Sequence, residues 1–268
     1  MDNTFWLKLA LGFLVGSLWI TLTTLSAERY GSKVGGLIGG LPSTVVIALL
    51  FIGYTQSPLV AAQATTVMPL AQGMNGLFIL AFILLIPRGL KLAMPVSLLV
   101  WFSLATFLYL LDRLNLLSFL ISIIGWLILL AFCYIVVERW MQIPSRSKQS
   151  IAYPPSQLIW RALFGGAVIS FAVLMGKLGG PLLGGIFGSF PAMFLSTLVI
   201  TSYIGGAAYS KPVGKSLLVS GLINVPLYEI MVRYLYPRVG LALGTSIAVV
   251  LSIGFGYMTF LFMKSRLS

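Results

Sequence analysis

The chain is built almost entirely from apolar runs that are long enough to cross a lipid bilayer as helices. A spanning helix needs about 20 predominantly apolar residues. The candidate spans are residues 5–25, 34–56, 59–86, 92–111, 114–137, 158–178, 181–206, 213–235 and 241–263. Hydrophobic residues make up 59% of the chain and charged residues only 8%, whereas soluble domains carry about 25% charged residues. The sequence therefore predicts an all-α polytopic membrane protein with about nine transmembrane helices.

The basic residues lie between these runs rather than along one polar helix face, which favours topology signals over a nucleic-acid-binding surface. Cytoplasmic loops carry an excess of Lys and Arg. The N-terminus is thus expected outside the cell (inner or plasma) membrane and the C-terminus in the cytoplasm. The loop between spans 181–206 and 213–235, with Lys211 and Lys215, lies inside in this arrangement. Five of the 17 basic residues fall outside: Lys8, Arg113, Lys177, Arg233 and Arg238.

The second half of the chain repeats the first half at a shift of 149 residues. GGLIGGLPST from residue 35 corresponds to GGIFGSFP from residue 184, and Tyr54 to Tyr203. Residues 1–112 then form one four-helix repeat and residues 158–268 the other, joined by a connecting helix and cytoplasmic linker at 113–157. Because an odd number of spans precedes the second repeat, it enters the membrane from the opposite side. The sequence predicts an inverted-topology repeat, a common plan of secondary transporters.

Each glycine–proline phrase predicts a helix break near the middle of the membrane. Proline lacks an N–H and clashes with the preceding turn, while glycine constrains the backbone little. Each helix is expected to restart at its proline, Pro42 or Pro191, and to direct free N–H groups and a positive dipole end into the break. An anionic or hydrogen-bond-accepting group is favoured there. Alternatively, the GxxxG spacing of these glycines serves only close helix packing.

Polar side chains at the same depth are the candidate substrate-binding residues. Gln72 and Asn75 lie three residues apart on one helix face, and Asn224 lies beside Pro226. Polar groups inside a membrane are costly and usually face a bundle interior. Interhelical hydrogen bonding for stability alone is the alternative. The expected site residues are Pro42, Ser43, Thr44, Gln72, Asn75, Pro191, Asn224 and Glu229.

Glu229 is the only acidic residue well inside a candidate span. It is the first candidate for a proton carrier if protons drive transport. Arg233 follows four residues later, at the spacing of an ion pair on one helix face. The sequence favours this pairing as the main role of Glu229.

Histidine is absent, Cys133 is the only cysteine, and no paired carboxylates or metal-ligand spacing occur. We therefore expect no enzyme activity, no metal and no cofactor, and we expect Cys133 to pack in the core. The pattern indicates a secondary-active transporter of a small anionic solute or lipid-linked substrate that works by alternating access. A non-transporting scaffold or accessory subunit is the alternative. The expected partners are the lipid bilayer and a small-molecule or lipid substrate, with no nucleic acid; a homodimer remains open.

The segments GGLIGGLPSTVVIALLFIG and GGIFGSFPAMFLSTLVITSYIGG resemble the glycine-rich, proline-containing helix of small four-span inner-membrane proteins of the GlpM type. The resemblance covers both halves, as though two such proteins had been fused in opposite orientations. The connecting fifth span departs from that family. The resemblance implies an integral membrane fold but no substrate and no site residue.

Overall fold

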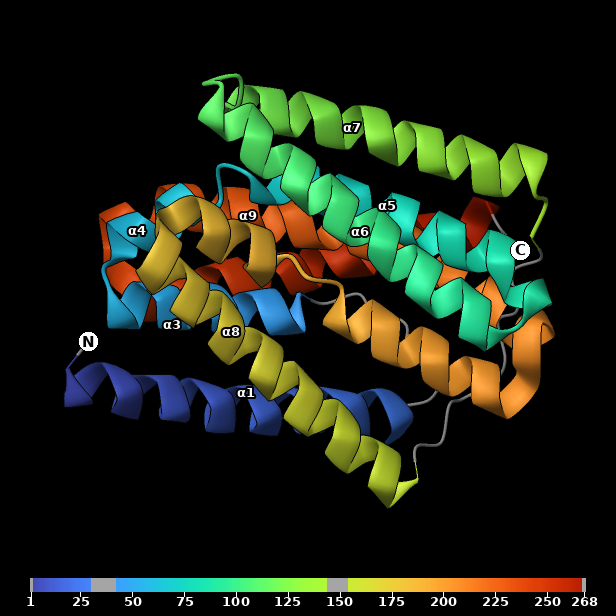
Figure 1. Cartoon of the computed structure of the whole chain (residues 1–268), viewed down its shortest axis with the longest axis horizontal. Coiled ribbons are helices and arrows are strands. Elements are labelled where there is room, and N and C mark those ends of the chain that lie inside the picture. Colours follow the sequence, from blue (N-terminus) through green and yellow to red (C-terminus); the bar gives the residue numbers. More distant parts are fainter. Residues whose placement is uncertain (1, 30–41, 144–153, 267–268) are drawn as a thin grey trace.

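The structure, a computed structural model, describes residues 2–29, 42–143 and 154–266 and contains no strand in these ranges. Its helices lie side by side and extend largely along one long axis (Figure 1). The all-α fold is confirmed. The helices are α1 (Asn3–Arg29), α3 (Ser43–Thr55), α4 (Pro58–Ala64), α5 (Met68–Leu85), α6 (Leu90–Arg113), α7 (Phe119–Ile135), α8 (Pro155–Gly188) and α9 (Ala192–Arg266); a 3₁₀ turn, Ile86–Arg88, follows α5 and a π turn, Val136–Trp140, follows α7.

Five stretches of the described chain are long and apolar enough to cross a membrane: Asn3–Leu25, Met68–Arg88, Leu90–Arg113, Phe119–Trp140 and the bent run Pro155–Met258. Large apolar side chains also point outward, and Leu99, Leu120 and Leu243 are each more than 60% exposed. These features fit a helical membrane protein, as the sequence predicts. The number of spans and the internal repeat stay predictions.

Glycines with positive φ reverse the chain within α8 and α9. Gly180 has a φ of 77°, Gly206 of 58° and Gly240 of 77°. These conformations are strained for residues with a Cβ atom. The expected loop around Lys211 and Lys215 is wrong, because the helix continues from residue 207 through Pro212 and the reversal is confined to Gly205 and Gly206. Two glycines suffice to turn the chain, so no longer loop is needed.

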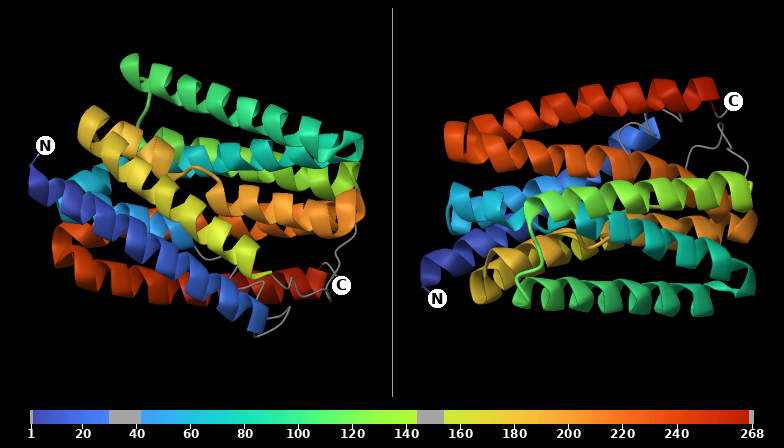
Figure 2. Two further views of the ribbon diagram at one scale, coloured as in Figure 1. Left: turned by 60° about the horizontal axis from the view of Figure 1, so that its bottom comes forward. Right: turned by 90° about the horizontal axis from the view of Figure 1, so that it is seen from above.

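The chain starts at one end of the molecule and finishes at the other, as Figure 1 shows and the views of Figure 2 repeat. Helix α3 runs from the middle of the molecule to the end near the N-terminus, where α4 begins. The first segment of α9, residues 192–205, runs from the middle to the opposite end (Figure 1). Two helices therefore begin in the middle of the molecule and run in opposite directions.

The predicted break at Pro191 is present. Helix α8 ends at Gly188, Ser189 to Pro191 are not helical, and α9 begins at Ala192. The prolines do not occupy the first helical position that we expected. Pro42 is the N-cap of α3 and its carbonyl accepts from Val46 at 2.8 Å, while the carbonyl of Pro191 accepts from Leu195 at 2.8 Å. Gly35, Gly36, Gly39 and Gly40, in the first glycine–proline phrase, lie outside the described residues.

The expected span 59–86 is divided between α4 and α5, which Thr65 to Val67 separate. Pro69 lies in the first turn of α5, where its missing N–H leaves no hydrogen bond unmade. The same ring would clash with the preceding turn if the helix continued through it. The division places Thr66, whose hydroxyl accepts from Arg233, between the two helices.

Helix α7 provides partners for backbone groups that these breaks leave without a helical partner. Pro226 has no N–H to offer the carbonyl of Leu222, and Trp126 Nε1 donates to that carbonyl at 2.6 Å. The N–H of Leu70, in the first turn of α5, donates to Ser122 Oγ at 3.0 Å. Both bonds are buried. Since backbone groups away from water need partners inside the protein, α7 holds α5 and α9 in position.

An ion pair fastens the far end of α7 to α9. Lys215 Nζ lies 2.9 Å from a carboxylate oxygen of Glu138 and donates to the carbonyl of Ile143 at 2.7 Å. Glu138 belongs to the π turn that follows α7. Cys133, in α7 itself, is fully buried, as expected.

Glycines of α8 allow close packing. A Cβ atom at Gly184 would lie 3.0 Å from Cα of Gly176, across the bend in α8. A Cβ atom at Gly185 would overlap the backbone carbonyl of Ala64 in α4. Gly184 and Gly185, the first two of the three glycines in the second glycine–proline phrase, therefore have a packing role.

We expect Gly185→Ala to destabilise the protein by about 1–3 kcal/mol, because the added methyl group collides with backbone that cannot rotate away. Gly254→Ala is the matched control, since Gly254 lies in α9 with no atom within 4 Å of the added methyl position. Thermal unfolding in detergent measures the difference. Equal melting temperatures for the two variants would contradict the packing described here.

Candidate functional site

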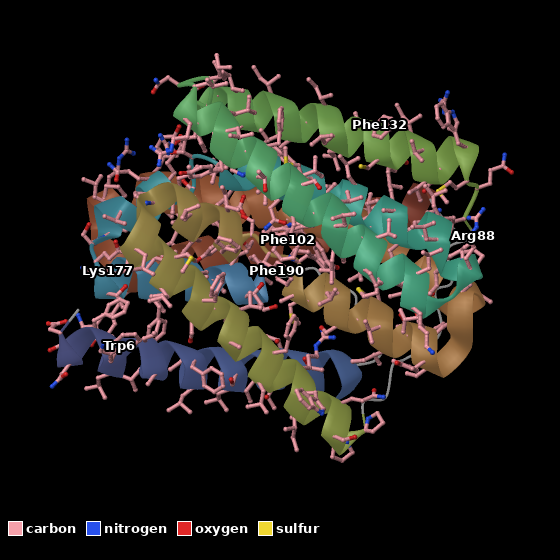
Figure 3. The ribbon with its side chains drawn as sticks, viewed as in Figure 1. Trp6, Arg88, Phe102, Phe132, Lys177 and Phe190 are labelled. Carbon is pink, nitrogen blue, oxygen red and sulfur yellow. The ribbon has the colours of Figure 1, made fainter. Side chains whose placement is uncertain are left out.

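A small cavity lies where the two helix starts meet in the middle of the molecule. The centre of a water molecule can occupy a volume of about 20 Å³ inside this cavity, which is enough for one water molecule. Phe190, on its wall, lies midway between Lys177 at one end of the molecule and Arg88 at the other (Figure 3). The cavity is lined by Pro42, Ser43, Thr44 and Val45 of the α3 start, Gln72 and Asn75 of α5, Ser189 to Pro191 of the break, and Met193, Phe194 and Val225 of α9.

Six of the eight expected site residues line this cavity: Pro42, Ser43, Thr44, Gln72, Asn75 and Pro191. Asn224 does not line it, although the next residue, Val225, does; the Asn224 side chain is buried, at 1% exposed. Glu229 lies one hydrogen bond behind the wall, because Gln72 Nε2 donates to its Oε1 at 3.3 Å. The expected residues from distant parts of the sequence are thus neighbours in space.

The first turns of α3 and α9 contribute unused backbone donors. The second and third N–H groups of each helix have no carbonyl four residues before them inside the helix. Within the described ranges no other acceptor reaches the N–H groups of Thr44, Val45, Met193 or Phe194. All four residues line the cavity. Two positive helix ends therefore face one small space.

Thr44 adds a side-chain donor to the same wall. Its side chain is 92% buried, given an exposed fraction of 8%. Its hydroxyl has no hydrogen-bond partner among the described residues, which makes it unlike the hydroxyls of Thr55, Thr65 and Thr201, each of which bonds its own helix backbone. The Thr44 hydroxyl is therefore free to bind a group in the cavity.

A directional chain of hydrogen bonds forms the opposite wall. Trp101 Nε1 donates to Asn75 Oδ1 at 2.9 Å. Asn75 Nδ2 donates to the carbonyl of Ser189 at 2.9 Å and to Gln72 Oε1 at 2.8 Å. Gln72 Nε2 carries a second N–H that has no acceptor among the described residues. One amide donor thus stays available next to the helix starts.

Aromatic rings close one side of the site. The Trp101 and Phe190 rings meet edge to face with centroids 4.8 Å apart, and Phe102 lies 6.3 Å from Phe190 (Figure 3). Sequence reasoning missed Trp101 and Ser189, which complete the polar wall. Two signals were available: Trp101 is a tryptophan in the middle of an apolar span, and Ser189 lies directly before the Phe–Pro break.

The expected ion pair between Glu229 and Arg233 is wrong. The Arg233 guanidinium donates to Thr66 Oγ1 at 2.9 Å and to the carbonyl of Ala62 at 3.4 Å, and it lies over the Phe119 ring at 4.1 Å. The gap between α4 and α5 offers these acceptors. Arg233 therefore turns toward that gap and away from Glu229.

No acidic side chain lines the described walls of the cavity, and the described residues hold no cluster of His, Cys, Asp or Glu that could bind a metal ion. The cavity instead gathers backbone N–H groups, one hydroxyl and one amide N–H. Such a set of donors binds a group that accepts hydrogen bonds and carries negative charge.

We expect Trp101→Phe to reduce stability by about 1–3 kcal/mol, because it leaves Asn75 Oδ1 buried without its donor. Trp19→Phe is the control, since Trp19 Nε1 is a buried donor that has no acceptor in the described structure. Thermal unfolding of both variants in detergent checks this. An equal or larger loss in Trp19→Phe would show that ring size matters and the hydrogen bond does not.

Comparisons with protein families, with curated proteins and with solved structures found no match to this chain. The resemblance to small membrane proteins of the GlpM type therefore rests on the two glycine–proline segments alone.

Proposed function

We propose that this protein is a secondary-active transporter that moves a small anionic solute across a cell membrane by alternating access. The observation that carries the proposal is the cavity at which two oppositely directed helices begin. In many transporters, half-helix N-termini near the midplane point at the anionic group of the substrate. Here four backbone N–H groups and the Thr44 hydroxyl offer such a group unused donors.

The proposed mechanism depends on an inverted repeat. Pro42 and Pro191, which the shift of 149 superposes, each precede a helix, and the two helices run in opposite directions (Figure 1). A shift of 150 superposes Pro87 on Pro237, and these prolines are followed by Gly89 and Gly240, both of which have positive φ. These correspondences support two repeats of opposite orientation that rock against one another around a fixed site.

The size of the cavity favours a small solute over a lipid-linked one, because the space holds about one water molecule. A scaffold without a solute path is the competing function, and the close packing at Gly184 and Gly185 favours it. Packing alone does not account for the unbonded Thr44 hydroxyl or for the unused Gln72 N–H. Transport therefore explains more of the site than a scaffold does.

Accessibility of Thr44 to water separates these two functions. In a Cys133→Ala background, we expect Thr44→Cys to react with a small charged thiol reagent, because alternating access opens the cavity to water. Ala48→Cys, one turn later in α3 and 2% exposed, does not line the cavity and is the control that should stay protected. Chloride, sulfate or inorganic phosphate should slow the reaction at position 44, whereas glycerol should not.

Uptake into proteoliposomes completes this test. At least one of the three radiolabelled anions should enter vesicles that contain the protein faster than protein-free vesicles. Complete protection of Thr44→Cys, together with no uptake of any of the three anions, would favour the scaffold.

The proposed orientation has its own test. Lys177 and Arg88 are both exposed and lie at opposite ends of the molecule (Figure 3). In the Cys133→Ala background, a membrane-impermeant thiol reagent added to intact cells should label Lys177→Cys. It should label Arg88→Cys only after the cells are opened. The reverse pattern would show that the protein has the opposite orientation in the membrane. Labelling of both variants in intact cells would contradict the proposal that residues 88 and 177 lie on opposite sides of the membrane.

A further inference from the structure

Glu229 is a buried carboxyl group without a neighbouring cation in the described structure. Its side chain is 0% exposed, and the ion pair between Lys215 and Glu138 is the one found in the described ranges. Arg233, on the same helix, is held by Thr66. Tyr228 and Tyr236 are the buried hydroxyl groups on the same part of α9. The elements that contact α9 also carry charged side chains, namely Arg88, Lys91, Asp112, Arg113, Arg161 and Lys177, and none of these forms an ion pair with Glu229 in the described structure.

The hydrogen-bond chain determines which oxygen of Glu229 is favoured as the site of a proton. An indole N–H only donates and a backbone carbonyl only accepts. Trp101 and the Ser189 carbonyl therefore allow only one orientation of the Asn75 amide. Asn75 in turn requires Gln72 Oε1 on its side, which directs Gln72 Nε2 toward Glu229. Oε1 of Glu229 must then accept a hydrogen bond, and because the carbonyl oxygen of a carboxylic acid is the stronger acceptor, the favoured place for a proton is Oε2.

Oε2 is buried and has no hydrogen-bond partner in the described part of the chain. An ionised carboxylate at this place would be uncompensated, and burying an unpaired charge is far more costly than burying a neutral acid. A proton on Oε2 removes the charge and leaves the Gln72 bond at Oε1 intact.

We propose that Glu229 takes up and releases a proton at Oε2 and that this proton crosses the membrane together with the anion; the inference rests on the transport function proposed above. An O–H bond forms at Oε2 with a proton from water on one side of the membrane. The same bond breaks when the proton passes to water on the other side. No electron is transferred.

Electrostatic repulsion between an ionised Glu229 and a bound anion couples proton binding to anion binding. Glu229 is one hydrogen-bonded side chain away from the cavity, since Gln72 touches both. In this low-dielectric interior a carboxylate at Glu229 repels an anion in the cavity. Protonation of Glu229 therefore strengthens anion binding, and by linkage anion binding strengthens proton binding to the same degree.

Proteoliposomes that contain the purified full-length protein and a pH-sensitive dye in their lumen test the coupling. Using whichever of chloride, sulfate and inorganic phosphate is transported, we expect an inward proton gradient to drive accumulation of the anion. We also expect an inward anion gradient to acidify the lumen. Glu229→Gln should lose both effects, while Asp112→Asn, at the end of α6, should keep both.

The outcomes separate the two proposals. Anion transport that moves no protons, or gradient-driven accumulation that persists in Glu229→Gln, overturns the role of Glu229 and leaves transport standing. Failure of all three anions to move overturns transport and the coupling with it. If Glu229→Gln does not fold, the number of protons that the unmodified protein transports with each anion still tests the proposal. Coupling requires protons to enter with the anion, and transport of the anion without protons would overturn it.

Discussion

The structure depends on supplying hydrogen-bond partners to backbone groups at helix breaks in an apolar interior. A break exposes N–H and C=O groups that lipid cannot satisfy, and each unsatisfied group costs several kcal/mol, or about as much as a lost core side chain. At Pro226 the partner is the Trp126 indole, and at the start of α5 it is the Ser122 hydroxyl. In the first turns of α3 and α9, the N–H groups of Thr44, Val45, Met193 and Phe194 have no such partner in the described chain, and a cavity is found there instead. The candidate site is therefore the place where N–H groups at helix starts lack a hydrogen-bond partner.

Donor and acceptor chemistry also gives the site a direction. The chain from Trp101 through Asn75 and Gln72 to Glu229 crosses from α6 to α5 to α9. Each side chain in it has one orientation, because its neighbour can only donate or only accept. The Ser189 carbonyl, freed by the break before Pro191, belongs to the same chain. The break before Pro191 therefore contributes to the cavity and also, through the Ser189 carbonyl, orients the side-chain amides of Asn75 and Gln72.

The sequence predicted the features that depend on composition and on local backbone chemistry. The apolar runs predicted the helical membrane fold, Pro191 predicted an interrupted helix, and the three-residue spacing of Gln72 and Asn75 predicted a shared face. Features that depend on a choice between partners were not predictable in this way. Arg233 lies at ion-pair spacing from Glu229, yet it binds Thr66, because the separation of α4 from α5 places a hydroxyl within its reach.

The sequence also did not predict contacts between residues that are far apart along the chain. Trp101 reaches Asn75 over a separation of 26 residues and Asn75 reaches Ser189 over 114, so no local pattern relates them. The sequence predicted that the chain turns after residue 206 but assigned residues 207–212 to a loop, whereas these residues are helical and the reversal lies at Gly205 and Gly206. Two glycines in permissive conformations made that loop unnecessary.

The tight reversals at Gly180, Gly206 and Gly240 have a consequence for how the chain is made. A connection of one or two residues leaves the ends of the two helices that it joins no room to separate. The segments on either side of each reversal are therefore tied together as a helical hairpin. The central cavity is lined by residues from Pro42 to Val225, so it is complete only after most of the chain has been made and its late segments have joined the early ones.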